Sequence, residues 1–184
     1  LSVNTAMHYK TDTVGRFLPG ISYRLKPVEG ISEGGRLWVH GPNIMEGYLL
    51  ASTPGKLIPP PEGWYDTGDM VEVDGEGYVR LKGRFKRFAK VGGEMISLAA
   101  VEEAITRLWP KHIHAVVARP TLKTGEELIL FTNFASAERS ALISFWTAHG
   151  LSKLSLPRVI HILPALPLLG SGKVNYKALE ERVK

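Results

Sequence analysis

The chain has 184 residues, of which 44% are apolar, so it can form one large or two small domains around a buried core. It contains no cysteine, which excludes disulfides and thiolate metal sites and permits a reducing compartment. A net charge of +5 favours acidic partners without naming them. No apolar stretch reaches the roughly 20 residues of a membrane span, and no signal-peptide pattern opens the chain. Because the first residue is Leu1 and not methionine, we expect a piece of a longer protein.

The first part of the sequence is typical of short strands separated by turns. The expected strands cover residues 13–18, 21–25, 36–40, 70–73 and 78–81. The sequence DGEG at residues 74–77 is a strong hairpin signal between the last two of them. The proline-rich residues 53–63 are expected to form a surface loop. Residues 1–85 are therefore predicted to form a small antiparallel β-unit.

The second part has a different pattern and is predicted to be a compact α+β unit of about 100 residues. Ser97 can cap a helix over residues 98–109, which Pro110 would end. A second helix is expected over residues 137–149 and a short one over 176–183. The expected strands cover residues 115–118, 128–134 and 158–163, with a turn at 124–126. The predicted fold class of the whole chain is α+β.

Six basic residues lie between Arg80 and Lys90, with no acidic residue among them. This basic run is either a solvated strand face or a surface for an acidic carrier protein, a nucleotide, a nucleic acid or an anionic lipid. The six residues are Arg80, Lys82, Arg84, Lys86, Arg87 and Lys90.

Two upstream motifs place polar groups beside glycines. The sequence GWYDTGD at residues 63–69 is read as a turn that carries two carboxylates, and such a carboxylate can accept both hydroxyls of a ribose. An ordinary Asx turn is the alternative. The sequence GRFK at residues 83–86 contains an arginine, whose fork suits sugar hydroxyls and phosphates, although a surface strand end has the same pattern.

Two further motifs lie downstream. The glycines of VGGE at residues 91–94 indicate close backbone approach within a strand, with a turn or bulge as the alternative. The sequence PLLGSGK at residues 167–173 places Lys173 on a glycine-rich loop, where an ammonium group is well placed to reach a carboxylate or phosphate. A solvated lysine is the alternative. The six histidines are scattered, so we predict no metal site in this chain.

Taken in this order, the motifs resemble the C-terminal third of acyl-adenylate-forming, AMP-binding enzymes. Residues 87–98 and 167–173 look most like the acyl-acyl carrier protein synthetase half of bifunctional 2-acylglycerophosphoethanolamine acyltransferases. The resemblance implies that residues 1–85 are the last β-subdomain of a large AMP-binding domain. It implies that residues 86–184 form a mobile C-terminal lid domain with its hinge at Lys86.

The resemblance also implies roles for single residues. Asp69 would bind the ribose hydroxyls of adenosine, Arg84 would contact the nucleotide, and Lys173 would be the catalytic lysine of adenylation. Gly93 would line the tunnel for a phosphopantetheine arm, which Lys90 would also face. Arg87 and the nearby lysines would contact an acidic carrier protein.

The implied reaction is the activation of a fatty acid with ATP and Mg²⁺, releasing pyrophosphate. The acyl group would pass to acyl carrier protein and then, through a linked acyltransferase, to a lysophospholipid. Such a protein would be cytoplasmic and held at the inner membrane of a bacterium. The family's phosphate loop and adenine-contacting segment do not occur in this sequence, so we expect the chain alone to be inactive.

Three alternatives remain. The chain could belong to another acyl-CoA synthetase-like ligase, or it could be a non-catalytic module that docks a carrier protein or a lipid surface through the basic run. A nucleic-acid binder is disfavoured by the moderate charge and by the lack of aromatic platforms in a recognisable motif.

Overall fold

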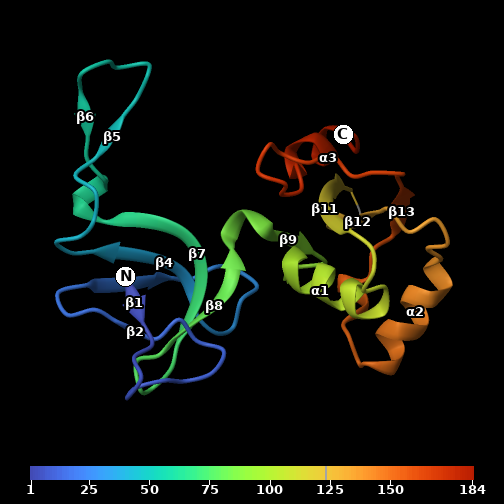
Figure 1. The fold of residues 1–184 in the computed structure, drawn as a ribbon, viewed down its shortest axis with the longest axis horizontal. Helices are drawn as coiled ribbons and strands as arrows, with labels where there is room; N and C mark the ends of the chain where they lie inside the picture. Colours follow the sequence, from blue (N-terminus) through green and yellow to red (C-terminus); the bar gives the residue numbers. More distant parts are fainter. Residues whose placement is uncertain (123) are drawn as a thin grey trace. The chain divides into compact units, whose positions relative to one another are not determined.

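The computed structural model describes residues 1–122 and 124–184, which pack as two compact units, Leu1–Lys86 and Arg87–Lys184. Both units contain antiparallel sheet, and the helices longer than one turn lie in the second (Figure 1). The predicted α+β fold class is confirmed.

A four-stranded antiparallel sheet with the order β3-β4-β7-β8 forms the centre of the first unit. Its strands are β3 (Ser22–Lys26), β4 (Gly35–His40), β7 (Tyr65–Val73) and β8 (Val79–Arg84). The unit also contains two separate two-stranded sheets. One pairs β1 (Ser2–Val3) with β2 (Arg16–Phe17), and the other pairs β5 (Tyr48–Leu49) with β6 (Leu57–Ile58). The core of the unit contains Leu37, Val39, Val71 and Val79.

The predicted turn at residues 63–69 is wrong, because β7 is one strand that begins at Tyr65. Gly68 has a φ of +72°, and the register of β7 with β4 shifts across it, because Trp38 pairs with Asp66 whereas Arg36 pairs with Met70. The glycine is therefore absorbed as a bulge within the strand and does not end it. Sequence reasoning also missed β6, which lies inside the expected loop at residues 53–63.

The hairpin between β7 and β8 is confirmed. The Asp74 carboxylate accepts hydrogen bonds from the backbone N–H groups of Tyr78 at 2.9 Å and Glu76 at 3.0 Å. The Lys10 ammonium donates to the same carboxylate at 2.7 Å. The hydrogen bond from Lys10, followed by the one from the Tyr78 backbone, lowers the pKa of Asp74 from 3.8 to about 2. Asp74 thus ties the turn to the N-terminal segment.

A five-stranded sheet forms the second unit. Four strands follow the antiparallel order β10-β9-β12-β11, and a fifth pairs with β12 in parallel. They are β9 (Phe88–Val91), β10 (Glu94–Ser97), β11 (His114–Thr121), β12 (Gly125–Thr132) and β13 (Val159–Ile162). The predicted turn at residues 124–126 is wrong in its position, because Gly125 and Glu126 already belong to β12 and pair with β11.

Alternating residues of β11 and β12 build a core on each face of this sheet. Val116 and Leu130 pack with α1 (Leu98–Leu108) and α2 (Arg139–Ala148). Val117 and Ile129 pack on the other face, with α3 (Tyr176–Glu181). All three predicted helices are present, and Ser97 caps α1 by accepting the Ala100 N–H at 3.3 Å. The α1–α2 face and the α3 face therefore carry different segments of the unit.

His114 is buried on the second sheet, with a polar partner at each ring nitrogen. One ring nitrogen, Nε2, lies 2.9 Å from the Trp109 carbonyl oxygen, and Nδ1 lies 2.9 Å from the Thr132 hydroxyl. The carbonyl can only accept, so Nε2 carries the proton and Nδ1 accepts from Thr132. Burial lowers the pKa of His114 below its usual 6.5, although the hydrogen bond to Trp109 opposes this.

Because of His114, the free energy of unfolding should therefore decrease as the pH is lowered. A depressed pKa gives stability that is fully present above 6.5 and is lost as the pH falls toward the lower folded value. Urea unfolding followed by tryptophan fluorescence should show a larger loss between about pH 7.5 and about pH 5.5 in the wild type than in His114→Gln. The exposed His149 supplies the matched control, and an equal pH dependence in His114→Gln and His149→Gln would contradict the assignment.

Candidate functional site

Asp69 and Arg84 are brought together as register partners on β7 and β8. The Arg84 Nε atom lies 3.0 Å from Asp69 Oδ1, and Arg84 Nη1 donates to the Thr67 carbonyl oxygen at 2.9 Å. The Arg84 side chain is 66% exposed and that of Asp69 is 23% exposed. The pair is therefore held by the sheet and remains open to a ligand.

The backbone around Asp69 is fixed from beneath. The buried Thr67 hydroxyl donates to the Leu37 carbonyl oxygen at 2.9 Å and accepts the Asp69 N–H at 3.1 Å. These bonds hold the bulged part of β7 against β4, so Asp69 does not depend on a flexible loop for its position.

A second ion pair supports the same bulge, and sequence reasoning missed it. Arg36 Nε on β4 donates to Asp66 Oδ1 at 2.9 Å, and the Gly68 N–H donates to that oxygen at 3.0 Å. The Arg36 guanidinium also lies over the Phe85 ring, 4.4 Å from its centroid. Only the pairing of β4 with β7 reveals this contact, because Arg36 and Asp66 are 30 residues apart.

The Asp69–Arg84 pair on β7 and β8 offers both a hydrogen-bond acceptor and a donor to a ligand. A carboxylate offers about four lone-pair sites, so the ion pair through Oδ1 leaves Asp69 able to accept ribose hydroxyls. The exposed guanidinium of Arg84 can donate to sugar or phosphate oxygens. The Asp69–Arg84 pair can therefore both accept from and donate to the oxygens of a polyol or a phosphate.

The basic run has acidic partners that the sequence order hides. Glu72 on β7 pairs with Lys82 at 2.6 Å and with Arg80 at 3.6 Å. Arg84 pairs with Asp69 in the same cross-strand manner. Three of the six basic side chains, those on β8, therefore have carboxylate partners across the hairpin.

Arg87 is engaged inside the second unit. Its Nη2 lies 2.6 Å from Glu102 Oε1, its Nη1 donates to the Val116 carbonyl oxygen at 3.0 Å, and its guanidinium covers the Tyr176 ring. The side chain is only 18% exposed. This geometry gives Arg87 a structural role and leaves little of it for the carrier protein that we expected it to contact. The preceding residue, Lys86, is exposed at the division between the two units.

Gly92 and Gly93 form the two-residue turn between β9 and β10, which is the turn alternative for this motif and not a close approach within a strand. Val91 pairs with Glu94, and the two glycines have φ values of +59° and +88°. Two positive φ values are typical of a type I′ hairpin turn, which favours glycine at both places. A Cβ on Gly93 would have no atom within 4 Å, so conformation and not space requires glycine there.

A shallow cavity of about 450 Å³ lies beside this turn. It is lined by Lys90, Gly92, Gly93, Thr124, Gly125 and Glu126. The Gly92 N–H donates to the Thr124 carbonyl oxygen at 2.8 Å, and the Lys90 N–H donates to the Glu126 carboxylate at 2.5 Å. The structure thus brings Gly93 and Lys90 to one glycine-lined cavity, which a narrow polar chain could enter.

Lys173 lies on a loop whose base is closed. Leu168 pairs with Val174, and the Leu169 N–H donates to the Lys173 carbonyl oxygen at 2.8 Å. Lys173 itself is exposed, and no residue that the structure describes forms an ion pair or side-chain hydrogen bond with its ammonium group. The lysine is free to meet an anionic group of a ligand.

Lys173 and the Gly92–Gly93 turn are associated with opposite faces of the five-stranded sheet. Leu166 and Val174, on either side of the Lys173 loop, pack on the α3 face. The position of a Cβ on Gly92 is 3.2 Å from the side chain of Leu154, which packs on the α1–α2 face. One face of the unit therefore presents Lys173, and the other supports the turn.

Among residues 1–122 and 124–184, no group of three or more His, Asp or Glu side chains is arranged to hold a metal ion. Within the same residues, no helix is long and apolar enough to cross a membrane.

Known proteins with similar sequences are ligases and a synthase. The chain is 34% identical over 157 residues to pyochelin synthase PchD of Pseudomonas aeruginosa, covering 84% of this chain and 29% of that protein. It is 35% identical over 181 residues to the anthranilate–CoA ligase of that species, covering 90% and 34%. It is 34% identical over 179 residues to the L-allo-isoleucine:holo-(CmaA peptidyl-carrier protein) ligase of Pseudomonas savastanoi pv. glycinea, covering 91% and 30%.

Solved structures of known proteins have a similar fold. ATP-bound MatB from Rhodopseudomonas palustris superposes with a TM-score of 0.69 and 25% identity, covering 93% of this chain and 35% of that one. The o-succinylbenzoate CoA synthetase MenE from Bacillus subtilis, in complex with its acyl-adenylate intermediate, has a TM-score of 0.73 at 24% identity, covering 93% and 36%. At this identity, the MenE structure indicates a similar fold and does not indicate a shared function.

The second unit has the fold of the C-terminal small domain of adenylate-forming enzymes. In sequence and fold, the chain corresponds to the C-terminal part of an AMP-binding enzyme of the acyl- and aryl-CoA ligase family. It spans about a third of the length of the curated relatives that it matches. No protein-family model matches the chain.

Proposed function

We propose that this chain serves an ATP-dependent ligase that forms an acyl-adenylate and then a thioester. The observation that carries the proposal is the Asp69–Arg84 pair, fixed on β7 and β8 and open to a ligand. The similarity in sequence to ligases, and in fold to ATP-bound MatB, supports the proposal.

ATP, with Mg²⁺ on its phosphates, would supply the adenylyl group. In this proposal Asp69 and Arg84 hold the ribose, and the Lys173 ammonium stabilises the negative charge that develops at the reacting carboxylate and α-phosphate. The exposure of Lys173 and its lack of a partner among the described residues suit this role, because no ion pair has to be broken before its ammonium contacts the reacting groups.

The second half-reaction uses the Gly92–Gly93 turn. A phosphopantetheine arm would pass Gly93 and Lys90 to reach the adenylate. Lys173 and this turn belong to opposite faces of the second sheet, so residues 86–184 would act as a lid that presents the two faces in succession. The hinge is proposed at Lys86, with residues 1–85 as the last subdomain of the AMP-binding domain.

For the whole protein we propose a fatty acid:acyl carrier protein ligase, located in the cytoplasm at a bacterial inner membrane. A linked acyltransferase would pass the acyl group to a lysophospholipid. The resemblance of residues 87–98 and 167–173 favours this substrate pair, and the relative named for the CmaA peptidyl-carrier protein supports a carrier as acceptor. CoA is the second candidate acceptor, because the anthranilate–CoA ligase is equally similar.

The acceptor is tested by incubating the full-length ligase with ATP, Mg²⁺, a fatty acid and either holo-acyl carrier protein or CoA. We expect intact-mass spectrometry to show the acylated carrier and little acyl-CoA. Formation of acyl-CoA alone would replace the carrier with the second candidate, and the absence of any fatty acyl thioester would reject the fatty-acid ligase.

A further inference from the structure

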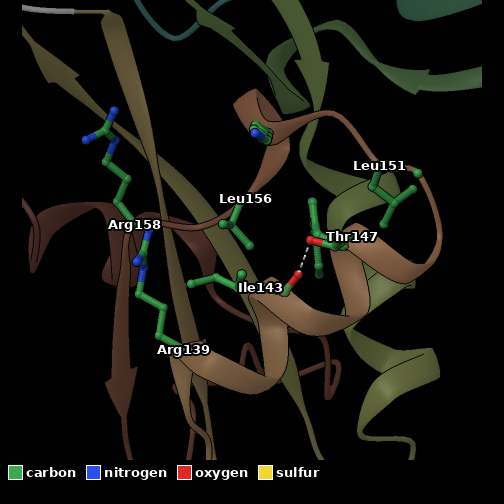
Figure 2. Close-up of a pocket in the computed structure, with 9 residues that line it drawn as sticks. Arg139, Ile143, Thr147, Leu151, Leu156 and Arg158 are labelled. Carbon is green, nitrogen blue, oxygen red and sulfur yellow. Dashed lines mark hydrogen bonds between the residues drawn. The ribbon is translucent and has the colours of Figure 1, made fainter.

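A groove lies on the α1–α2 face of the second unit, between α2 and the short helix η3 (Lys153–Ser155), and Figure 2 shows it. We call it the α2–η3 groove. It has a volume of about 580 Å³. Its lining residues are Arg139, Ile143, Trp146, Thr147, Gly150, Leu151, Lys153, Leu156 and Arg158.

The floor of the α2–η3 groove is apolar and open. Ile143 is 41% exposed and Leu151 is 36% exposed, and Leu156 lies close to Ile143 in the view of Figure 2. Trp146 is buried beneath, with its indole N–H donating to the Ser155 hydroxyl at 2.9 Å. Exposed apolar residues gathered in a concave surface mark an interaction site more often than scattered ones do.

The rim of the groove is basic. Arg139, Lys153 and Arg158 are all exposed, and the lining residues include no acid. Arg139 and Arg158 lie along the same side of the groove (Figure 2). Among the described residues, the nearest acidic partner of the three is Glu127, 4.0 Å from Arg158 and already bonded to Arg119. Unlike the basic side chains of β8, these three cations are largely unpaired with acidic residues, so they can interact with an acidic partner.

The groove adjoins the Gly92–Gly93 turn. The short helix η3 connects the two: its Lys153 lines the groove, and the side chain of the next residue, Leu154, lies 3.2 Å from the position of a Cβ on Gly92. A partner seated on η3 is therefore next to the cavity that Gly93 and Lys90 line.

We propose that the α2–η3 groove docks an acidic amphipathic helix of the carrier protein whose arm enters beside Gly93. The proposal rests on the proposed carrier-dependent function. The apolar floor takes the apolar side of the helix, and Arg139, Lys153 and Arg158 meet its acidic residues. A carrier explains the groove better than a free lipid or fatty acid does, because η3 places the groove next to the turn that the arm must pass.

The test measures binding of holo-acyl carrier protein to this chain by isothermal titration calorimetry at low salt. Arg139→Glu and Lys153→Glu should each weaken binding by about tenfold or more, and the wild-type affinity should fall with added salt. Both residues are exposed, and Arg139 lies at the first position of α2, where glutamate suits the helix dipole, so the folds should survive. Lys177→Glu, the same charge change on α3, is the matched control and should stay within about twofold.

Three outcomes would overturn the docking surface. The first is equal carrier affinity of Arg139→Glu and wild type, and the second is equal weakening in Lys177→Glu. The third comes from a parallel measurement with phosphatidylglycerol vesicles, in which Arg139→Glu would lose vesicle binding and keep carrier binding. In the full-length ligase, Arg139→Glu should raise KM for the carrier and leave fatty acid-dependent pyrophosphate release unchanged. A normal KM would reject the groove while leaving the ligase intact, whereas a wild type that ignores the carrier would reject the acceptor itself.

Discussion

Replacing Lys173 with alanine should slow acyl-adenylate formation in the full-length ligase by about 10²–10³-fold. This is the loss expected when one stabiliser of developing negative charge is removed. Thioester formation from pre-made acyl-adenylate should change far less, because the opposite face of the second unit then serves the reaction. Single-turnover measurements of both half-reactions provide the comparison.

Lys177→Ala is the matched control for this prediction. Lys177 is an exposed lysine four residues further along the chain, and its removal should leave both half-reactions unchanged. Equal losses in the two half-reactions of Lys173→Ala would show that Lys173 serves both states or only supports the fold.

Gly93→Leu should reduce thioester formation by about 10²-fold and spare adenylation, because misplacing a reacting group by about 1 Å has effects of that size. The φ of +88° adds strain of roughly 1–2 kcal/mol for any side chain at this position. The leucine side chain would also extend from the turn that lines the 450 Å³ cavity.

Gly93→Ala separates these two effects. It carries the backbone strain with little bulk, so it should retain most of the acyl transfer that Gly93→Leu loses. If the alanine and leucine variants lose transfer equally, strain in the turn is the cause and the arm does not pass Gly93. Normal transfer by Gly93→Leu would reject this path for the arm altogether.

The strands and helices were predictable where local pattern decides structure. The Asp74 hairpin, the Ser97 cap and the helices of the second unit follow from turn chemistry, capping and apolar spacing. The turn predicted at residues 63–69 was wrong because glycine beside aspartate is typical of turns. The structure instead keeps β7 continuous by placing Gly68 in a bulge supported by Asp66 and Arg36.

The candidate site was predictable residue by residue, and its arrangement was not. Pairing of Asp69 with Arg84 depends on the register of β7 with β8, which the sequence alone does not give. The same long-range pairing supplies Glu72 and Glu102 to the basic run, so its charge was overestimated. The α2–η3 groove was missed because its cations, Arg139, Lys153 and Arg158, are spread over 20 residues and meet only in the fold.

The central claim is that Asp69 and Arg84 hold the nucleotide during adenylation, and pyrophosphate–ATP isotope exchange tests it most directly. Exchange by the full-length wild-type ligase should depend on added fatty acid. Asp69→Ala should raise KM for ATP strongly, and Arg84→Ala should do so to a lesser degree, whereas Lys173→Ala should act mainly on kcat. Unchanged exchange and an unchanged KM for ATP in Asp69→Ala would contradict the account.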